Sequence, residues 1–408
     1  MSAVGDTPCD TPPGRGLQGC LAALASLDAM GPGRLRALLG AMCPDRAWHE
    51  LSTGTALRHG SWPVSGEGRT LFPAAVLRSW CESAASVPEL PALMSERLSR
   101  CGVDALAAPH LPRRLSEDPD PPGVLFVSGS ARGCLGGTEG GDGRSGGPAI
   151  GGPAVAIVGT RRASEYGLGV ARRLGRELAA AGVGIVSGLA LGIDAAAHAG
   201  ALGAGPSAAP GVVHLGVLGA GHDRPCPSRN RALARSVAGC GALLSEVPPG
   251  VASAPWRYPV RNRLIAALAD VVVVVESASR GGSMSTVEEA LVRDRVVMAV
   301  PGAVGRRGAT GCHDLIRDGA GICTGAHDVI EALELLGFPT GAGPAHRSGV
   351  VAHDPYQAAV LDALCDGPLC LDAVARKCSL EVSRLSALLV EMQAAGLLAC
   401  ESGWVRLR

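Results

Sequence analysis

The sequence predicts an α/β fold: a Rossmann-like doubly wound parallel sheet with a small N-terminal helical domain and a C-terminal winged helix. Between residues 124 and 300, short apolar runs rich in β-branched residues recur without polar alternation, which is typical of strands buried on both faces of a parallel sheet. Amphipathic stretches of helical length separate these runs. The last 55 residues contain three helix-like stretches followed by two short apolar pairs, the order found in a winged helix.

The N-terminal part divides into a tail and a helical domain. Residues 1–18 are polar and rich in Pro and Gly, so we expect a disordered tail. Residues 19–115 contain short helix-like stretches, and the segment 21–39 is interrupted by Gly31-Pro32-Gly33. This pattern is similar to that of a SAM or helix-hairpin-helix domain, but we expect a helical hairpin that only packs within its domain.

The central region, 116–340, carries the strand–helix alternation of the Rossmann-like domain. A Gly-rich stretch at 129–152 follows the first strand and is predicted to be an insertion. We expect helices at 166–181, 229–238 and 284–293. The predicted strands are 124–127, 155–158, 183–186, 212–218, 242–244, 271–275 and 296–300.

The C-terminal part begins with a Gly, Pro and His-containing linker at 341–353. Residues 354–408 follow as the predicted winged helix, with helices at 355–365, 371–377 and 382–395. The apolar pairs at 397–398 and 404–405 fit a short hairpin.

Charge and cysteine content restrict the function classes. The whole chain has a formal net charge of zero, yet residues 155–325 hold 18 Arg against 12 acidic residues. A locally basic domain suits an anionic partner at one site. The 14 cysteines form no CxxC pair, so we expect free thiols, no metal and no cofactor. No signal peptide or membrane span is evident, which predicts a cytoplasmic protein.

Four loops that follow predicted strands carry glycine, hydroxyl or Arg residues. Ligands of doubly wound sheets bind outside the carboxyl ends of the strands. Glycine lets backbone N–H groups approach an anion, and the N-terminus of the next helix adds a positive dipole end. Taken singly, each loop could be an ordinary tight turn, but together they predict a phosphate-binding rim made by Gly159-Thr160-Arg161, Ser187-Gly188, Gly219-Ala220-Gly221 and Arg280-Gly281-Gly282-Ser283.

The segment 258–263 places two arginines near the predicted start of a helix. Pro259 suits the first helical position, which would put Arg261 and Arg263 in the first turn. Positive charge there opposes the helix dipole, and a bound anion would reverse that cost. We therefore predict contact with an anion, and the alternative is pairing of the arginines with Glu246 or Glu276.

The sequence offers little support for a nucleotide-binding, metal or nucleophile site. It contains no GxxxxGK[ST] motif and no GxGxxG at Gly159, which disfavours a P-loop NTPase and a dinucleotide enzyme. Asp194 and His198, four residues apart, could form an acid–base pair or part of a metal site. We expect instead that Asp194 caps its helix and that His198 packs. Ser187 lacks a GxSxG context and is not assigned as a nucleophile.

The motifs as a set resemble the DNA-processing protein A family, also called DprA or Smf. Their order and spacing hold over residues 110–335. The flanking regions match the layout of that family more weakly. The strings that carry the resemblance are Ala156–Arg161, Ser187–Ala190, Gly192–Asp194 with His198, Val217–Gly221 with Asp223, Pro227 and Asn230, then Ser245-Glu246, Tyr258–Arg263, Pro301-Gly302, Leu315-Ile316 and Gly319-Ala320.

The resemblance implies a homodimer that binds single-stranded DNA without sequence preference and loads the RecA recombinase in natural transformation and recombination. It implies no catalytic residue, no cofactor and no membrane insertion. The DNA phosphate pocket expected from the resemblance and the loops together comprises Gly159, Thr160, Arg161, Ser187, Gly188, Arg231, Arg261, Asn262, Arg263, Gly281, Gly282 and Ser283.

Two other functions are considered. Residues 281–289 look like the PGGxGTxxE loop of nucleoside-5′-monophosphate phosphoribohydrolases, although Gly282 and Thr286 are one residue too far apart and Arg280 replaces the Pro. Release of free base from AMP that Glu289→Gln abolishes would favour this enzyme. A transcription factor acting through 382–395 is the second alternative, but Arg384 is the one cation in that stretch.

Overall fold

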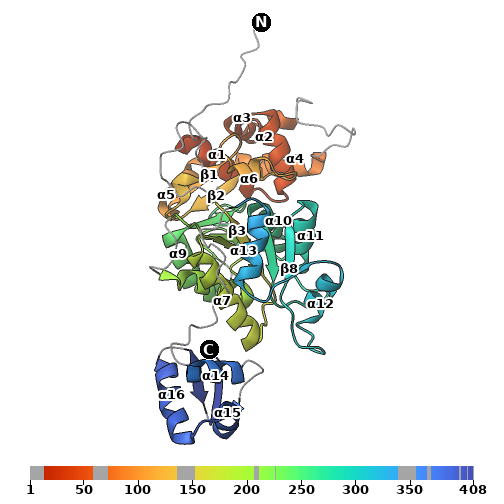
Figure 1. Ribbon diagram of the computed structural model, residues 1–408. Coiled ribbons are helices and arrows are strands. Elements are labelled where there is room, and N and C mark those ends of the chain that lie inside the picture. The colour runs from red at the N-terminus through yellow and green to blue at the C-terminus, as the bar shows by residue number, and fades with distance from the viewer. Residues whose placement is uncertain are drawn as a thin grey trace. The chain divides into compact units, whose positions relative to one another are not determined.

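The structure is a computed structural model that describes residues 13–57, 72–135, 152–205, 211–225, 227–338, 355–364, 369–394, 397–401 and 403–407 (Figure 1). The chain divides into two compact units, Met1–Gly341 and Ala342–Arg408, and each is described by itself. Residues 136–151, most of the predicted Gly-rich insertion, lie outside the described residues, as does the predicted linker at 341–353.

The first unit begins with helices packed around their own apolar core. Leu21, Leu24, Leu38, Leu51 and Trp80 form its centre. Helix α1 begins at Arg15, before the predicted end of the tail at residue 18. The side chain of Gln18 accepts a hydrogen bond from the Ala105 amide and joins this turn to the rest of the unit. Residues 1–12 of that predicted tail lie outside the described residues. The helices are α1 (Arg15–Ser26), α2 (Pro32–Ala41), α3 (Pro44–Ser52), η1 (Thr55–Leu57), α4 (Ala74–Ser86) and α5 (Leu90–Cys101).

A strand stands where the sequence predicted only helices. Strand β1 (Val103–Leu106) pairs antiparallel with β2 (Leu125–Ser128). The short helix α6 (Arg113–Ser116) lies between these two strands in the chain. Val103 and Phe126 face the N-terminal helices, whereas Leu106 and Val127 face the core of the sheet domain. The helical region and the Rossmann-like part therefore share this strand pair and are not separate domains.

Every strand that the sequence predicted between 124 and 300 is present, and no end shifts by more than three residues. The sheet has nine strands in the order β1-β2-β6-β5-β4-β3-β7-β8-β9. All pairings from β6 to β9 are parallel, whereas β2 pairs antiparallel with β6. The remaining strands are β3 (Ala154–Val158), β4 (Gly184–Ser187), β5 (Leu215–Leu218), β6 (Ala242–Ser245), β7 (Val271–Val274), β8 (Val296–Ala299) and β9 (Gly321–Ile322).

Helices cover both faces of the sheet. One apolar cluster joins the strands to α10 and α11, and a second joins the opposite side of β3 and β4 to α7 and α8. This alternation explains why the strands are apolar throughout. The helices and 3-10 turns of this part are η2 (Arg132–Cys134), α7 (Glu165–Ala180), α8 (Ile193–Leu202), η4 (Ser228–Asn230), α9 (Arg231–Cys240), α10 (Arg257–Leu268), α11 (Met284–Val292), α12 (Thr310–Arg317) and α13 (Ala326–Leu335).

The strand order reverses between β3 and β7. From β3 the chain runs outward through β4, β5 and β6, and α10 then brings it back to β7 on the other side of β3. In open α/β sheets such a switch point leaves a crevice at the carboxyl ends of the strands. The topology therefore places a binding site above β3 and β7.

The second unit has a core of its own, formed by Val360, Val374, Leu385, Leu389 and Val405. Its three-stranded sheet has the order β10-β12-β11. The elements are those of the predicted winged helix: α14 (Pro355–Ala363), β10 (Leu369–Cys370), α15 (Leu371–Cys378), α16 (Val382–Ala394), β11 (Leu398–Glu401) and β12 (Trp404–Leu407).

Among the described residues, no helix combines the length and the apolar character needed to cross a bilayer.

Candidate functional site

A cleft of about 750 Å³ lies at the switch point. The loops after β3 and β7 and the first turns of α10 and α11 form it, and Ala190 from the loop after β4 adds to its wall. Most of the residues predicted from sequence line this cleft: Gly159, Thr160, Arg161, Arg261, Asn262, Gly281, Gly282 and Ser283.

The loop after β3 is locked against its neighbours by close backbone packing. A Cβ on Gly159 would lie 2.6 Å from the side chain of Ile193, so only glycine fits. The amide of Thr160 donates to the carbonyl of Glu276 at 2.7 Å. The carboxylate of Glu276 accepts from the amide and the hydroxyl of Ser164 and thereby holds the start of α7. The loop backbone is therefore fixed before any ligand binds, and Glu276 is not paired with Arg261 or Arg263.

Two cations stand at the mouth of this cleft. Arg161 and Arg162 both line it, and both side chains are exposed to solvent. The guanidinium carbon of Arg161 lies 5.0 Å from the ring centroid of Tyr258, within cation–π range. Arg161 is thus oriented by an aromatic ring while its charge stays open to solvent.

Arg261 forms the floor of the cleft and is only 7% exposed. Its Nη1 donates to the carbonyl oxygens of Gly188, at 2.9 Å, and Val217. Burial lowers the pKa of the guanidinium, and the charge of Asp194 opposes that effect. A Cβ on Gly188 would lie 2.6 Å from the guanidinium carbon, so the glycine is needed for this packing. Arg261 therefore connects the loop after β4 to strand β5 through its hydrogen bonds, and it places a buried positive charge next to the cleft.

Ser187 and Gly188 support the floor and do not line the cleft. Ser187 is fully buried, and its hydroxyl donates to the carbonyl of Ile157 at 2.7 Å. Asp194 was expected to cap its own helix, but it does not. Its Oδ2 accepts from the amides of Gly188, at 3.1 Å, and Ala190, at 3.4 Å, and so fixes the loop after β4.

The possible acid–base pair is not formed. No hydrogen bond joins the side chains of Asp194 and His198, both of which are described. Burial raises the pKa of Asp194 and lowers that of His198 to about 3. Within the described part of the chain, no group of three or more His, Cys, Asp or Glu side chains could hold a metal ion.

Arg263 occupies a different place from the one predicted. Helix α10 begins at Arg257, two residues before Pro259, so Arg261 and Arg263 lie in the second turn and not in the first. Arg263 is 4% exposed and does not line the cleft. Its guanidinium pairs with Glu246 and with Asp120, the latter at 3.2 Å. For Arg263 the alternative of an ion pair with Glu246 is therefore the one observed. The reason is that α10 directs this side chain away from the side of the helix that carries Arg261.

The start of α11 supplies another part of the cleft wall. Asn262 donates from Nδ2 to the Ser285 hydroxyl at 2.7 Å, and the Ser283 hydroxyl donates to that of Ser277 at 2.8 Å. Ser283 makes no side-chain cap hydrogen bond to the helix. The amides of Met284 and Thr286 already donate to the carbonyls of Gly281 and Ser283, at 3.0 and 3.1 Å, which leaves the amide of Ser285 for an anion in the cleft.

Arg231 does not line the cleft, although it is exposed at the start of α9. The residue before it, Asn230, donates to the carbonyls of Leu189 and Ala190 at 2.8 and 3.1 Å. Since Ala190 belongs to the cleft wall, this contact holds α9 next to the site.

Sequence reasoning missed several residues of the cleft. Their position in the sequence could have identified them, because each lies after a strand or near the start of a helix at the same edge of the sheet. They are Arg162, Ala190, Pro255, Ser277, Ser285 and Thr286.

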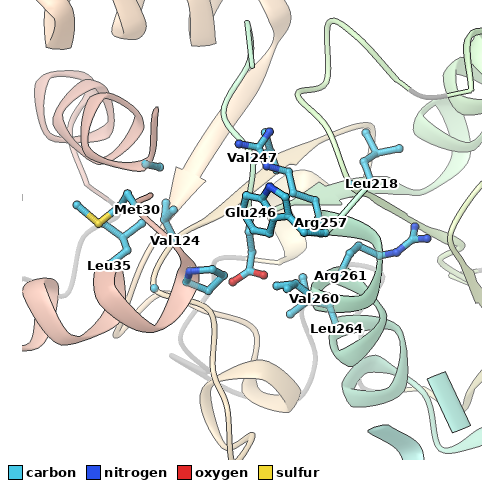
Figure 2. Close-up of a pocket in the computed structure, with 15 residues that line it drawn as sticks. Met30, Leu35, Val124, Leu218, Glu246, Val247, Arg257, Val260, Arg261 and Leu264 are labelled. Carbon is cyan, nitrogen blue, oxygen red and sulfur yellow. The ribbon is translucent and has the colours of Figure 1, made fainter. Parts of the chain in front are cut away.

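A smaller cavity of about 40 Å³, lined by both apolar and charged residues, lies on the other side of α10 (Figure 2). Met30 and Leu35 of the helical region line it together with Val260 and Leu264 of α10. Figure 2 shows the carboxylate of Glu246 directed toward Val260 and Leu264. Burial raises the pKa of Glu246 to about 7, and its Oε2 has no hydrogen-bond partner.

Comparison with known proteins extends over both units. The sequence profile described as DNA recombination-mediator protein A matches residues 145–334, and the profile described as DprA winged helix domain matches residues 344–403. Protein Smf of Escherichia coli is 34% identical over 306 residues, covering 73% of this chain and 75% of that protein. DNA processing protein DprA of Bacillus subtilis is 34% identical over 266 residues, covering 65% and 82%.

Two DprA sequences of Mycobacterium tuberculosis are 38% identical over 257 residues, and the matched part spans 62% of this chain but 64% of each relative. Among solved structures, DprA from Streptococcus pneumoniae matches with a TM-score of 0.52 and 26% identity, covering 79% of this chain and 98% of that one.

Proposed function

The chain belongs to the DNA recombination-mediator protein A family, known as DprA or Smf, and from that premise we propose that it binds single-stranded DNA without sequence preference in the cleft above β3 and β7. The bound strand would then be passed to the RecA recombinase during DNA uptake and recombination. The cytoplasm is the proposed location, and a homodimer is the proposed assembly.

The observation that carries the proposal is the arrangement of cations around one cleft. Arg161 and Arg162 are exposed where they line it, Arg261 lines it as a buried cation, and the N-terminus of α11 lines the same cleft. Among the described residues that line the cleft, Asp194 is the one carboxylate, and two loop amides already bind it. Such a site attracts phosphate groups, which supply most of the affinity of non-specific DNA binding.

The cleft also favours unpaired strands. Tyr258 lines it and carries Arg161 against its ring, so aromatic and guanidinium surfaces lie beside the phosphate-binding groups. Bases can stack on such surfaces only when they are not already paired in a duplex.

We propose that the chain performs no bond chemistry. Glu289, which the phosphoribohydrolase alternative would need, pairs with Arg293 and does not line the cleft. Asp194 is held by backbone amides and is not directed at a reacting atom. This arrangement favours a binding site over a hydrolase.

The winged helix is proposed to be an accessory or protein-contact module. Helix α16 has Arg384 as its one cation, and the guanidinium carbon of Arg384 lies 4.2 Å from the ring centroid of Tyr356. A helix that reads a DNA groove normally offers several free polar or basic side chains. Transcriptional control through α16 therefore has little support.

A salt titration of single-stranded DNA binding tests the proposal. Arg161→Ala should weaken binding of all sequences alike and reduce the slope of log K against log salt by about one unit, since one phosphate contact is lost. Arg113→Ala is the matched control, because Arg113 is exposed on α6 and does not line the cleft. An unchanged slope for Arg161→Ala, or equal binding of duplex and single strand by the wild type, would contradict the assignment.

A further inference from the structure

We infer that Trp256, with Arg257 behind it, is a stacking site for a base of the DNA strand whose backbone occupies the cleft. The inference rests on the proposed function and adds a residue that the cleft itself does not contain. It follows from the exposure of Trp256, from its packing and from its position next to the phosphate-binding groups.

Trp256 is the first observation. Its side chain is 52% exposed, whereas Trp48 and Trp80 are buried. Trp256 directly precedes α10 and makes no cap hydrogen bond to that helix. The start of the helix therefore gives no structural reason for an indole at this position. Tryptophan is enriched at binding interfaces.

Arg257 holds the indole in place. Its guanidinium carbon lies 5.0 Å from the Trp256 ring centroid, and its Nη1 donates to the carbonyl of Ala252. Burial lowers the pKa of Arg257, so this guanidinium is partly withdrawn from water. One side of the indole is thus braced by a fixed cation, and half of the side chain still faces solvent. A rigid aromatic surface of this kind loses little conformational freedom when a base stacks on it.

The position of this pair connects it to the proposed DNA site. Pro255 and Tyr258 line the cleft on one side of α10, whereas Trp256 and Arg257 line the small cavity on the other side. Arg261 borders both. Two stacks of arginine on an aromatic ring, Arg161 on Tyr258 and Arg257 on Trp256, therefore stand at the same helix start. A strand held by its phosphates in the cleft can place the next base on Trp256 as it crosses α10.

The experiment compares two ligands of equal charge in the full chain. A fluorescein-labelled oligo(dT) offers bases, whereas an abasic oligonucleotide of the same length offers only the sugar–phosphate backbone. Trp256→Ala should lower the affinity for oligo(dT) roughly five- to a hundredfold and leave the affinity for the abasic strand unchanged. Trp256→Phe should retain most of the affinity for oligo(dT). Because stacking removes no phosphate contact, the salt slope should stay as in the wild type.

Trp404→Ala is the matched control, since Trp404 is an equally exposed indole in the winged-helix unit and should leave both affinities unchanged. Unchanged oligo(dT) binding by Trp256→Ala, together with a reduced salt slope for Arg161→Ala, would overturn the stacking site while leaving the proposed function intact. Equal loss of affinity for both ligands would also overturn it, because a backbone effect does not depend on bases. Failure of the wild type to bind oligo(dT) would remove the proposed function and this inference together.

Discussion

Two histidines of the sheet domain are buried and a third is half-buried, and no described carboxylate forms a hydrogen bond with any of them. His198 is fully buried, His214 accepts a hydrogen bond from the amide of Ile185, and His222 lies next to the carbonyl of Leu243. Burial lowers the pKa of His198 to about 3 and those of His214 and His222 to about 4. All three are therefore neutral in the folded protein at ordinary pH.

These histidines predict a loss of stability on acidification. Their folded pKa values lie below the unfolded value of about 6.5, so the stability they contribute is complete above pH 6.5 and is lost as the pH falls toward 4, by about 1.4 kcal/mol per pH unit for each. The contribution of Glu246 to stability depends on pH in the opposite direction. Burial raises its folded pKa to about 7, so this contribution is complete below the unfolded pKa and is lost as the pH rises through 7. The three histidines outweigh it.

Urea unfolding at several values between pH 7.5 and pH 5 measures this slope. His198→Leu should reduce it by about 1.4 kcal/mol per pH unit, because one proton fewer binds on unfolding. A variant with the slope of the wild type would show that His198 is not the source.

At the level of residues, the sequence could identify the cleft but not the direction of each side chain. Gly159, Thr160 and Arg161 follow a buried strand, and that position alone predicted their place. Arg263 looked equivalent to Arg261 in the sequence, yet α10 starts at Arg257 and turns Arg263 toward Glu246. A shift of two residues in a helix start is invisible to pattern analysis and decides which cation faces the ligand.

At the level of elements, α7 and α8 pack unusually close because each contributes a glycine to the contact. A Cβ on Gly200 would lie 2.7 Å from the carbonyl carbon of Arg172 and nearer still to its oxygen. A Cβ on Gly175 would lie 3.0 Å from the carbonyl carbon of Ala197. The two backbones therefore touch where a side chain would separate them.

Gly200→Ala should destabilise the protein by about 1–3 kcal/mol, since the added methyl group forces the two helices apart. Gly169→Ala is the matched control: Gly169 is exposed in α7, and a Cβ there meets nothing within 4 Å. This control should raise stability by up to about 1 kcal/mol, because alanine is the better helix former. Thermal unfolding of both variants checks the pair, and equal effects would argue against the close contact.

The elements that the sequence predicted and those it missed differ in burial and length. The runs at 155–158 and 271–275 are apolar throughout and mostly β-branched, which identified them as central strands. Strand β1 has only the sequence Val-Asp-Ala-Leu and follows a helix directly. Strands β9 and β10 have two residues each, which is too short for any periodicity. These three depend on pairing partners that lie far away in the sequence.

At the level of the whole molecule, the structure changes where the chain can be cut. The sequence suggested a DNA-binding fragment that starts at residue 116, but β1 and the helical region cover one side of β2. Ion pairs of Asp120 with Arg36 of α2 and Arg263 of α10 cross the same junction.

A fragment ending at residue 341 should fold and bind single-stranded DNA with an affinity close to that of the full chain, because it keeps the first unit intact. A fragment of residues 116–340 should instead expose Phe126 and aggregate or unfold. Circular dichroism and DNA binding of the two fragments distinguish them. Loss of binding by the longer one would assign the winged helix a direct part in DNA contact.

The pairing of β2 with β6 has a consequence for synthesis on the ribosome. Phe126 pairs with Ser245, so β2 has no partner on this edge until about 120 further residues have been synthesised. At ordinary translation rates that takes roughly 6–24 seconds. During that interval the nascent chain holds an apolar strand with one hydrogen-bonding edge empty. The N-terminal third of this protein therefore depends on β6, which is synthesised later, and a chaperone would be most useful before β6 emerges.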